Sequence, residues 1–270
     1  MAGFKTRVLS AIVLVAVLGT ALYFGGAYLW ALLLFLSLIG LFEFYRAMKP
    51  VDKRTGFGVN ALEIMGYTGC ILYYIVLFFT FSEKYLFFSL IGILIISMFA
   101  FVLKYPEYHS NMFMSDYFGI IYVCVTLSFV YMTRMRPGGE KTVWIIFISS
   151  WICDTCAYLV GVAIGKHKLV PKLSPKKSIE GAVGGVTGSA LVGFIFARIV
   201  GDNAVNYMII GAAGAVISQF GDLTASAIKR NHDIKDYGRL IPGHGGVLDR
   251  FDSVIITAPV VYILSEIITK

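Results

Sequence analysis

The chain has 270 residues, of which 58% are hydrophobic and 14% are charged, and its mean hydropathy is +0.79. A soluble domain carries about 25% charged residues, so this composition excludes an ordinary soluble protein and indicates a polytopic membrane protein. The formal net charge is +7. Four cysteines lie in apolar stretches, which favours buried reduced thiols over a disulfide framework. They are Cys70, Cys124, Cys153 and Cys156.

Apolar runs of about 17 to 25 residues are typical of membrane-spanning helices. They predict an all-α protein with nine spans, near residues 8–25, 27–48, 61–81, 85–103, 117–133, 143–164, 181–199, 204–228 and 250–269. With the N-terminus inside, 17 Lys and Arg residues lie on the inner side and 6 on the outer side. Positive residues gather in cytoplasmic loops, so this bias predicts a cytoplasmic N-terminus, an outer C-terminus and two polar loops facing the cytoplasm.

Charge is unevenly distributed along the chain. Residues 1–142 are apolar spans with short connections, and we interpret them as a scaffold. Residues 143–270 hold nearly every charged cluster, and we predict that they form the functional region. Glu43 and Glu63 fall within or beside predicted spans. Either residue fits a helix-end carboxylate or an ion pair as well as it fits a functional group.

Asp222 lies near the inner end of the eighth predicted span. Ser226, Lys229 and Arg230 follow it at helical spacing, so the four side chains should share one face of a helix. A final basic turn suits the helix dipole and the lipid headgroups, and that alone explains Lys229 and Arg230. It does not explain the carboxylate, whose insertion costs about 2.5 to 3.5 kcal/mol. We therefore predict that Asp222 binds a cation.

The segment 231–248 is polar and rich in glycine, which lets backbone N–H groups approach an anion closely. Asp249 follows it at the start of the ninth span. An N-cap explains Asp249 as well as a shared metal with Asp222 does, although a glycine pair before a helix is also a phosphate site. The other residues in or beside this segment that we expect to bind substrate are Lys235, Asp236, His244, Gly245, Gly246, Arg250 and Asp252.

A second basic loop precedes the helix that we expect to open at 180–181. A positive loop can serve topology alone, but Ser174, Lys176 and Lys177 alternate hydroxyl and ammonium groups in a manner that suits phosphate. Asp154 interrupts the sixth span, and we expect it to be a buried carboxylate that faces the interior.

These motifs resemble one family closely, the phosphatidate cytidylyltransferases or CDP-diacylglycerol synthases. The resemblance is strong over residues 150–255. It rests on Ser226-x-x-Lys229-Arg230, Lys235-Asp236-x-Gly238, Pro242-x-His244-Gly245-Gly246-x-x-Asp249-Arg250-x-Asp252, Ser174-Pro-Lys-Lys-Ser-x-Glu-Gly181 and Asp154-x-x-Ala-Tyr158. Ala225 stands where many members carry Glu, so an acidic ligand at that position is not essential to this chain. Cys153, Cys156, Val162 and Ser178-Ile179 are further departures.

The resemblance implies transfer of a cytidylyl group from CTP to phosphatidic acid, with release of pyrophosphate, by a multi-pass enzyme of the inner cell membrane that forms a homodimer. It implies Mg²⁺ on Asp222 and Asp249, beside a second cation such as K⁺ or another divalent ion. Phosphate chemistry of this kind needs positioning and positive charge more than a general base. Two alternatives stay open, another CTP-dependent lipid enzyme such as a polyprenol kinase and, more remotely, an ion transporter.

Overall fold

The computed structural model describes residues 2–49, 59–243 and 245–268, with side chains from residue 8 onward. The chain forms two compact units. Met1–Tyr131 and Asp236–Arg250 make up the first, and Met132–Lys235 and Phe251–Lys270 make up the second. The polar segment before the last helix therefore groups with the N-terminal helices, although it is distant from them in sequence.

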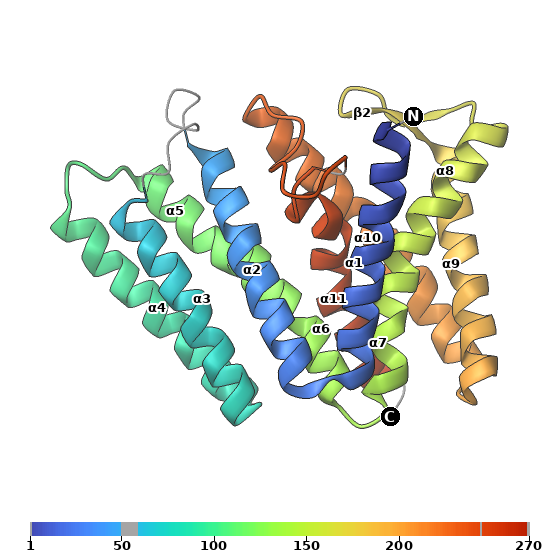
Figure 1. Ribbon diagram of the computed structural model, residues 1–270, viewed down its shortest axis with the longest axis horizontal. Coiled ribbons are helices and arrows are strands. Elements are labelled where there is room, and N and C mark those ends of the chain that lie inside the picture. Colours follow the sequence, from blue (N-terminus) through green and yellow to red (C-terminus); the bar gives the residue numbers. More distant parts are fainter. Residues whose placement is uncertain (1, 50–58, 244, 269–270) are drawn as a thin grey trace. The chain divides into compact units, whose positions relative to one another are not determined.

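The first unit is a set of apolar helices, with α3 and α4 running as an antiparallel pair (Figure 1). Its elements are α1 (Ala2–Phe24), α2 (Gly26–Met48), α3 (Ala61–Thr80), α4 (Glu83–Leu103), α5 (Ser110–Gly119), the π-helical segment η2 (Ile120–Val125) and most of α6 (Thr126–Met135). Asn60 caps α3 by accepting a hydrogen bond from the Glu63 amide at 2.9 Å. The buried Glu63 carboxylate is also paired with Lys49 at 2.9 Å, as a helix-end carboxylate would be.

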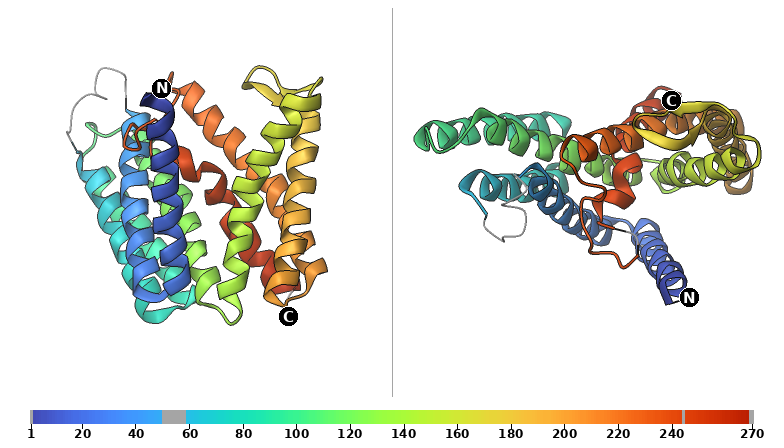
Figure 2. Two further views of the ribbon diagram at one scale, coloured as in Figure 1. Left: turned by 45° about the vertical axis from the view of Figure 1, so that its right-hand side comes forward. Right: turned by 90° about the horizontal axis from the view of Figure 1, so that it is seen from above.

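The second unit combines long helices with a short antiparallel β-hairpin. Its elements are α7 (Gly139–Phe147), the π-helical segment η3 (Ile148–Ile152), α8 (Cys153–Ile164), β1 (Lys168–Val170), β2 (Ser174–Ser178), α9 (Ile179–Val200), α10 (Ala204–Asn231) and α11 (Leu248–Ile268), whose first turn belongs to the first unit. The hairpin contacts the ends of α8 and α9 (Figure 2). The sequence predicted a loop here, so the two strands are an addition to the predicted all-α fold.

Small residues let α8 and α9 approach closely. A Cβ added at Gly185 would lie 2.8 Å from the Cys153 sulfur, and one at Gly181 would lie 2.7 Å from the Ala157 carbonyl oxygen. Close contact through small residues is a common way to pack membrane helices, because burial from water does not drive association there. The packing fixes α8 beside α9, and the hairpin joins the two helices.

Helices account for most of the described chain. Among the described residues, eight helical segments are long and apolar enough to cross a membrane: α2, α3, α4, Ser110–Met135, Gly139–Ile164, α9, α10 and α11. The first predicted span corresponds to α1, whose described side chains form a shorter apolar stretch, Val8–Phe24. The predicted class, a helical polytopic membrane protein, agrees with this architecture.

Candidate functional site

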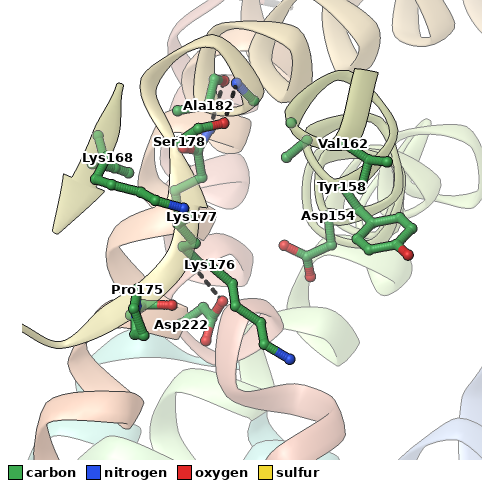
Figure 3. Close-up of a pocket in the computed structure, with 16 residues that line it drawn as sticks. Asp154, Tyr158, Val162, Lys168, Pro175, Lys176, Lys177, Ser178, Ala182 and Asp222 are labelled. Atoms are coloured by element: carbon green, nitrogen blue, oxygen red, sulfur yellow. Dashed lines mark hydrogen bonds and ion pairs between the residues drawn. The ribbon is translucent and has the colours of Figure 1, made fainter. Parts of the chain in front are cut away.

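A cavity of about 560 Å³ in the second unit brings together three parts of the sequence. Figure 3 shows side chains from α8, from the hairpin and from α10 around it. Its charged and hydroxyl-bearing lining includes Asp154, Tyr158, Lys168, Ser174, Lys176, Lys177, Ser178 and Asp222. The hairpin residues that were predicted to bind phosphate and the aspartate that was predicted to bind a cation therefore line the same cavity.

Asp222 is paired with Lys177 across this cavity. The Lys177 ammonium lies 2.5 Å from one carboxylate oxygen of Asp222, and both side chains are 27% exposed (Figure 3). The Ser226 hydroxyl donates to the other oxygen at 3.4 Å, which confirms that these residues share a helix face. The carboxylate thus has a side-chain cation on one oxygen and a weak hydroxyl donor on the other.

Asp154 lines the same cavity, and its side chain extends into the space between α8 and the hairpin (Figure 3). The prediction that this carboxylate is buried was wrong, because the residue is exposed. A run of apolar residues marks a span but does not distinguish packing against protein from lining an open cavity. Asp154 is nevertheless placed with Asp222 in one site.

The hairpin that carries the lysines is held at its base by Glu180. The carboxylate of Glu180 accepts hydrogen bonds from the backbone amides of Lys166 and His167, and lies 2.6 Å from the His167 ring nitrogen Nδ1. Ser178 caps α9 by accepting from the Gly181 amide at 3.1 Å, and the helix begins at Ile179, one residue before the predicted start at 180–181. Lys176 is exposed, while Lys177 is half-buried against α10.

The end of α10 carries two cations of the second unit, Lys229 and Arg230. Lys229 is buried, and its ammonium lies 3.7 Å from a carboxylate oxygen of Asp252. Arg230 is exposed and donates to the Ile234 carbonyl oxygen at 3.1 Å. These two cations, which the sequence treated alike, have different surroundings.

From Asp236 onward the glycine-rich segment belongs to the first unit, and its backbone amides donate hydrogen bonds to carboxylates. One oxygen of the buried Asp249 accepts hydrogen bonds from the Tyr237 amide at 2.9 Å and from the Gly246 amide at 3.0 Å. Asp249 lies in the first turn of α11 and is therefore not its N-cap. Its carboxylate instead joins two parts of the preceding loop, at Tyr237 and at Gly246. Lys235 and Asp236 are exposed, Gly245 has a φ of 89°, and His244 lies outside the described residues.

Sequence reasoning did not identify the role of Glu43. This residue of α2 is 3% exposed, and its carboxylate accepts from the Val247 amide at 3.0 Å and from the Leu248 amide at 2.8 Å. It therefore caps α11 from another helix. A lone glutamate in an apolar span was the only available signal, and nothing local connects it to a loop more than 200 residues away.

Each unit gathers its own part of the predicted site. The second unit holds Asp154, Ser174, Lys176, Lys177, Asp222, Ser226, Lys229, Arg230, Lys235 and Asp252, and the first holds Asp236, Gly245, Gly246, Asp249 and Arg250. The predicted sharing of one metal by Asp222 and Asp249 stays a prediction. The donor chemistry suits the ion, because Mg²⁺ prefers oxygen ligands and is usually bound by one or two carboxylates together with substrate phosphates.

Comparison with known proteins gives a family match over residues 5–268, to a model described as the cytidylyltransferase family. The chain is similar to a phosphatidate cytidylyltransferase of Bacillus subtilis strain 168, with 32% identity over 98% of each chain. It is 39% identical to a protein of that name from Staphylococcus epidermidis RP62A, over 63% of this chain and 67% of the relative. A third, from Thermotoga maritima, is 36% identical over 55% of this chain and 57% of its own length.

Proposed function

This chain belongs to the cytidylyltransferase family, and on that premise we propose that it transfers a cytidylyl group from CTP to phosphatidic acid. An oxygen of the lipid phosphate attacks the α-phosphorus of CTP. The bond from that phosphorus to the bridging oxygen breaks, and pyrophosphate leaves. The products are CDP-diacylglycerol and pyrophosphate. The observation that carries the proposal is the similarity to the Bacillus subtilis enzyme over nearly the whole of both chains.

The cavity of the second unit supplies what this reaction needs. The nucleophile is a phosphate whose second pKa is about 6, so it is largely ionised at neutral pH and requires no general base. The remaining barrier includes repulsion between two polyanions, which positioned positive charge lowers. Lys168, Lys176 and Lys177 line the cavity on the hairpin side and provide that charge.

Residue roles follow from these surroundings. Lys177 and Ser226 contact Asp222, so phosphate oxygens that attract the ammonium would release the carboxylate. We propose that Lys229 and Arg230 at the end of α10, and Arg250 in the first turn of α11, also neutralise phosphate charge. We propose that Asp222 and Asp249 hold Mg²⁺, beside a second cation. When bound, the metal would neutralise triphosphate charge and orient the reacting groups.

The lipid tail has a candidate position beside the polar cavity. A second cavity of about 390 Å³ lies between α9 and α10, and most of its lining is apolar, including Val183, Val186, Val216, Phe220 and Leu223. Leu169, Ala182 and Gln219 line both cavities, so an apolar groove adjoins a phosphate-binding surface. We place an acyl chain of phosphatidic acid in this groove, because the chain stays in apolar surroundings while the headgroup reaches the lysines.

The proposed setting is the inner cell membrane, with nine spans, a cytoplasmic N-terminus, an outer C-terminus and the active site on the cytoplasmic side. Positively charged loops support this orientation. We propose a homodimer as the assembly. Cysteine labelling from either side of sealed vesicles checks the topology, and cross-linking in membranes checks the dimer.

The decisive experiment supplies membranes containing this chain with CTP, phosphatidic acid and Mg²⁺, and identifies both products. We expect CDP-diacylglycerol and pyrophosphate in equal amounts. Release of CDP together with a newly phosphorylated lipid alcohol would instead indicate a kinase. Ion counterflow without nucleotide would indicate a transporter. Membranes from cells carrying the empty vector are the control.

A further inference from the structure

A buried glutamate from the N-terminal half holds the loop that carries Asp249. Glu43 is in α2, the residue is 3% exposed, and its carboxylate accepts one hydrogen bond from each of the Val247 and Leu248 amides. We propose that Glu43 is a positioning residue for the cytidylyl-transfer site, which it serves by fixing the start of α11. The inference rests on the proposed function, and it extends the working part of the chain into the region that composition marks as scaffold.

The carboxylate is chemically matched to its two donors. The first amides of a helix have no partner within the helix, and the helix dipole favours negative charge at that end. A glutamate whose oxygens each accept one amide satisfies both donors and is stabilised by the dipole. A glutamine at the same place could accept with one oxygen only, and its NH₂ group would face the second N–H donor.

Two glycines leave room for this carboxylate. A Cβ added at Gly238 or at Gly246 would lie less than 3.0 Å from carboxylate atoms of Glu43, a distance that real side chains do not reach. Both positions belong to the glycine-rich motifs on which the sequence resemblance rests. Their glycines are therefore explained by a side chain from α2, in addition to any need for backbone flexibility.

Asp249 completes the same arrangement from within the loop. Its carboxylate accepts hydrogen bonds from the Tyr237 and Gly246 amides. The carboxylate of Glu43 accepts from the two amides that follow Gly246, those of Val247 and Leu248. Four backbone donors are thus divided between two carboxylates. If the hydrogen bonds from Val247 and Leu248 to Glu43 are lost, the first turn of α11 can shift, and the side chains of Asp249 and Arg250 change direction with it. A displacement of about 1 Å can cost about a hundredfold in rate.

The test compares purified Glu43→Gln with Glu63→Gln as a matched control. Glu63 is also a buried glutamate of the first unit, but its carboxylate contacts the side chains of Lys49 and Asn60. We expect Glu43→Gln to lower kcat about tenfold or more with a smaller change in the KM for CTP. Amide hydrogen exchange in the peptide containing residues 246–249 should become faster. Glu63→Gln should change neither quantity per folded molecule.

A compensating pair separates positioning from general destabilisation. Gly246→Ala should behave like Glu43→Gln, because the added methyl group displaces the carboxylate. Combining Gly246→Ala with Glu43→Asp should recover part of the lost kcat, since the shorter side chain makes room for the methyl group. If Glu43→Gln does not fold, Glu43→Asp alone replaces it, with a smaller expected loss of kcat and faster exchange at 246–249.

Wild-type kcat together with unchanged exchange at residues 246–249 in the Glu43 variant would overturn the inference. Equal losses in the Glu43 and Glu63 variants would also overturn it, since they would indicate general destabilisation. Absence of cytidylyl transfer by the wild-type protein would instead refute the proposed function. In that case the exchange measurement still decides whether Glu43 holds the loop.

Discussion

Asp222 and Asp249 were predicted to act together, yet the two units surround them in different ways. Asp222 lines the cavity, is 27% exposed and is paired with the side-chain ammonium of Lys177. Asp249 is 6% exposed and binds two backbone amides of its own loop. A side-chain cation can move away when a substrate arrives, whereas backbone donors move only with the loop. Asp222 is thus suited to release Lys177 when a substrate or metal ion binds. Asp249 is suited to fix the conformation of its loop as well as to bind a cation.

The strongest test of this difference replaces each aspartate with asparagine. We expect both variants to lose about a hundredfold in cytidylyl transfer, because each loses charge where polyanions react. Only Asp249→Asn should also lower the unfolding temperature, since its buried carboxylate organises two amides and an unsatisfied buried donor costs about 1–3 kcal/mol. Product formation with Mg²⁺ and thermal unfolding in detergent measure the two effects.

Thr224→Val on α10 serves as a control for these variants, because its exposed hydroxyl donates only to the Phe220 carbonyl within the helix. Near-normal activity of either aspartate variant would show that the metal assignment is wrong. Equal loss of stability in both would remove the distinction between an exchanging carboxylate and a structural one.

Local sequence patterns predicted the parts of this site that depend on neighbours along the chain. The spacing of Asp222 and Ser226 indicated a shared helix face, and their side chains are in contact. The start of α9 was anticipated from the polar residues before it. Hydropathy located the helices for the same reason, since a run of apolar side chains is a local property.

The parts that depend on distant contacts could not be predicted. The hairpin β1–β2 has no alternating apolar pattern, and Glu180 secures it through amides at the end of α8. Glu43 caps the start of α11 by accepting from the amides of Val247 and Leu248, which follow it in the sequence by 204 and 205 positions. In both cases a carboxylate satisfies backbone donors of another segment, and nothing in the local sequence of either partner identifies the other.

A smaller effect is expected when Asp222 loses its partner but keeps its charge. Lys177→Met preserves much of the side-chain length and removes the ammonium that lies 2.5 Å from Asp222. We expect activity to fall about tenfold, because the phosphates lose one charge-assisted contact while the aspartate remains. Steady-state kinetics with both substrates measures this. A larger loss than that of Asp222→Asn would mean that the lysine, rather than the aspartate, is the principal group.

The smallest effect should come from Lys176, which lines the same cavity but is exposed. Its ammonium is hydrated before substrate binds, so Lys176→Ala should raise the KM for CTP or phosphatidic acid severalfold and leave stability unchanged. Lys172→Ala removes another exposed lysine of the hairpin region, one that is not part of the cavity lining, and should change neither constant. If the two lysine variants behave alike, the hairpin contributes only general positive charge. If only Lys176→Ala responds, the phosphates bind on the face of the hairpin that lines the cavity with Asp222.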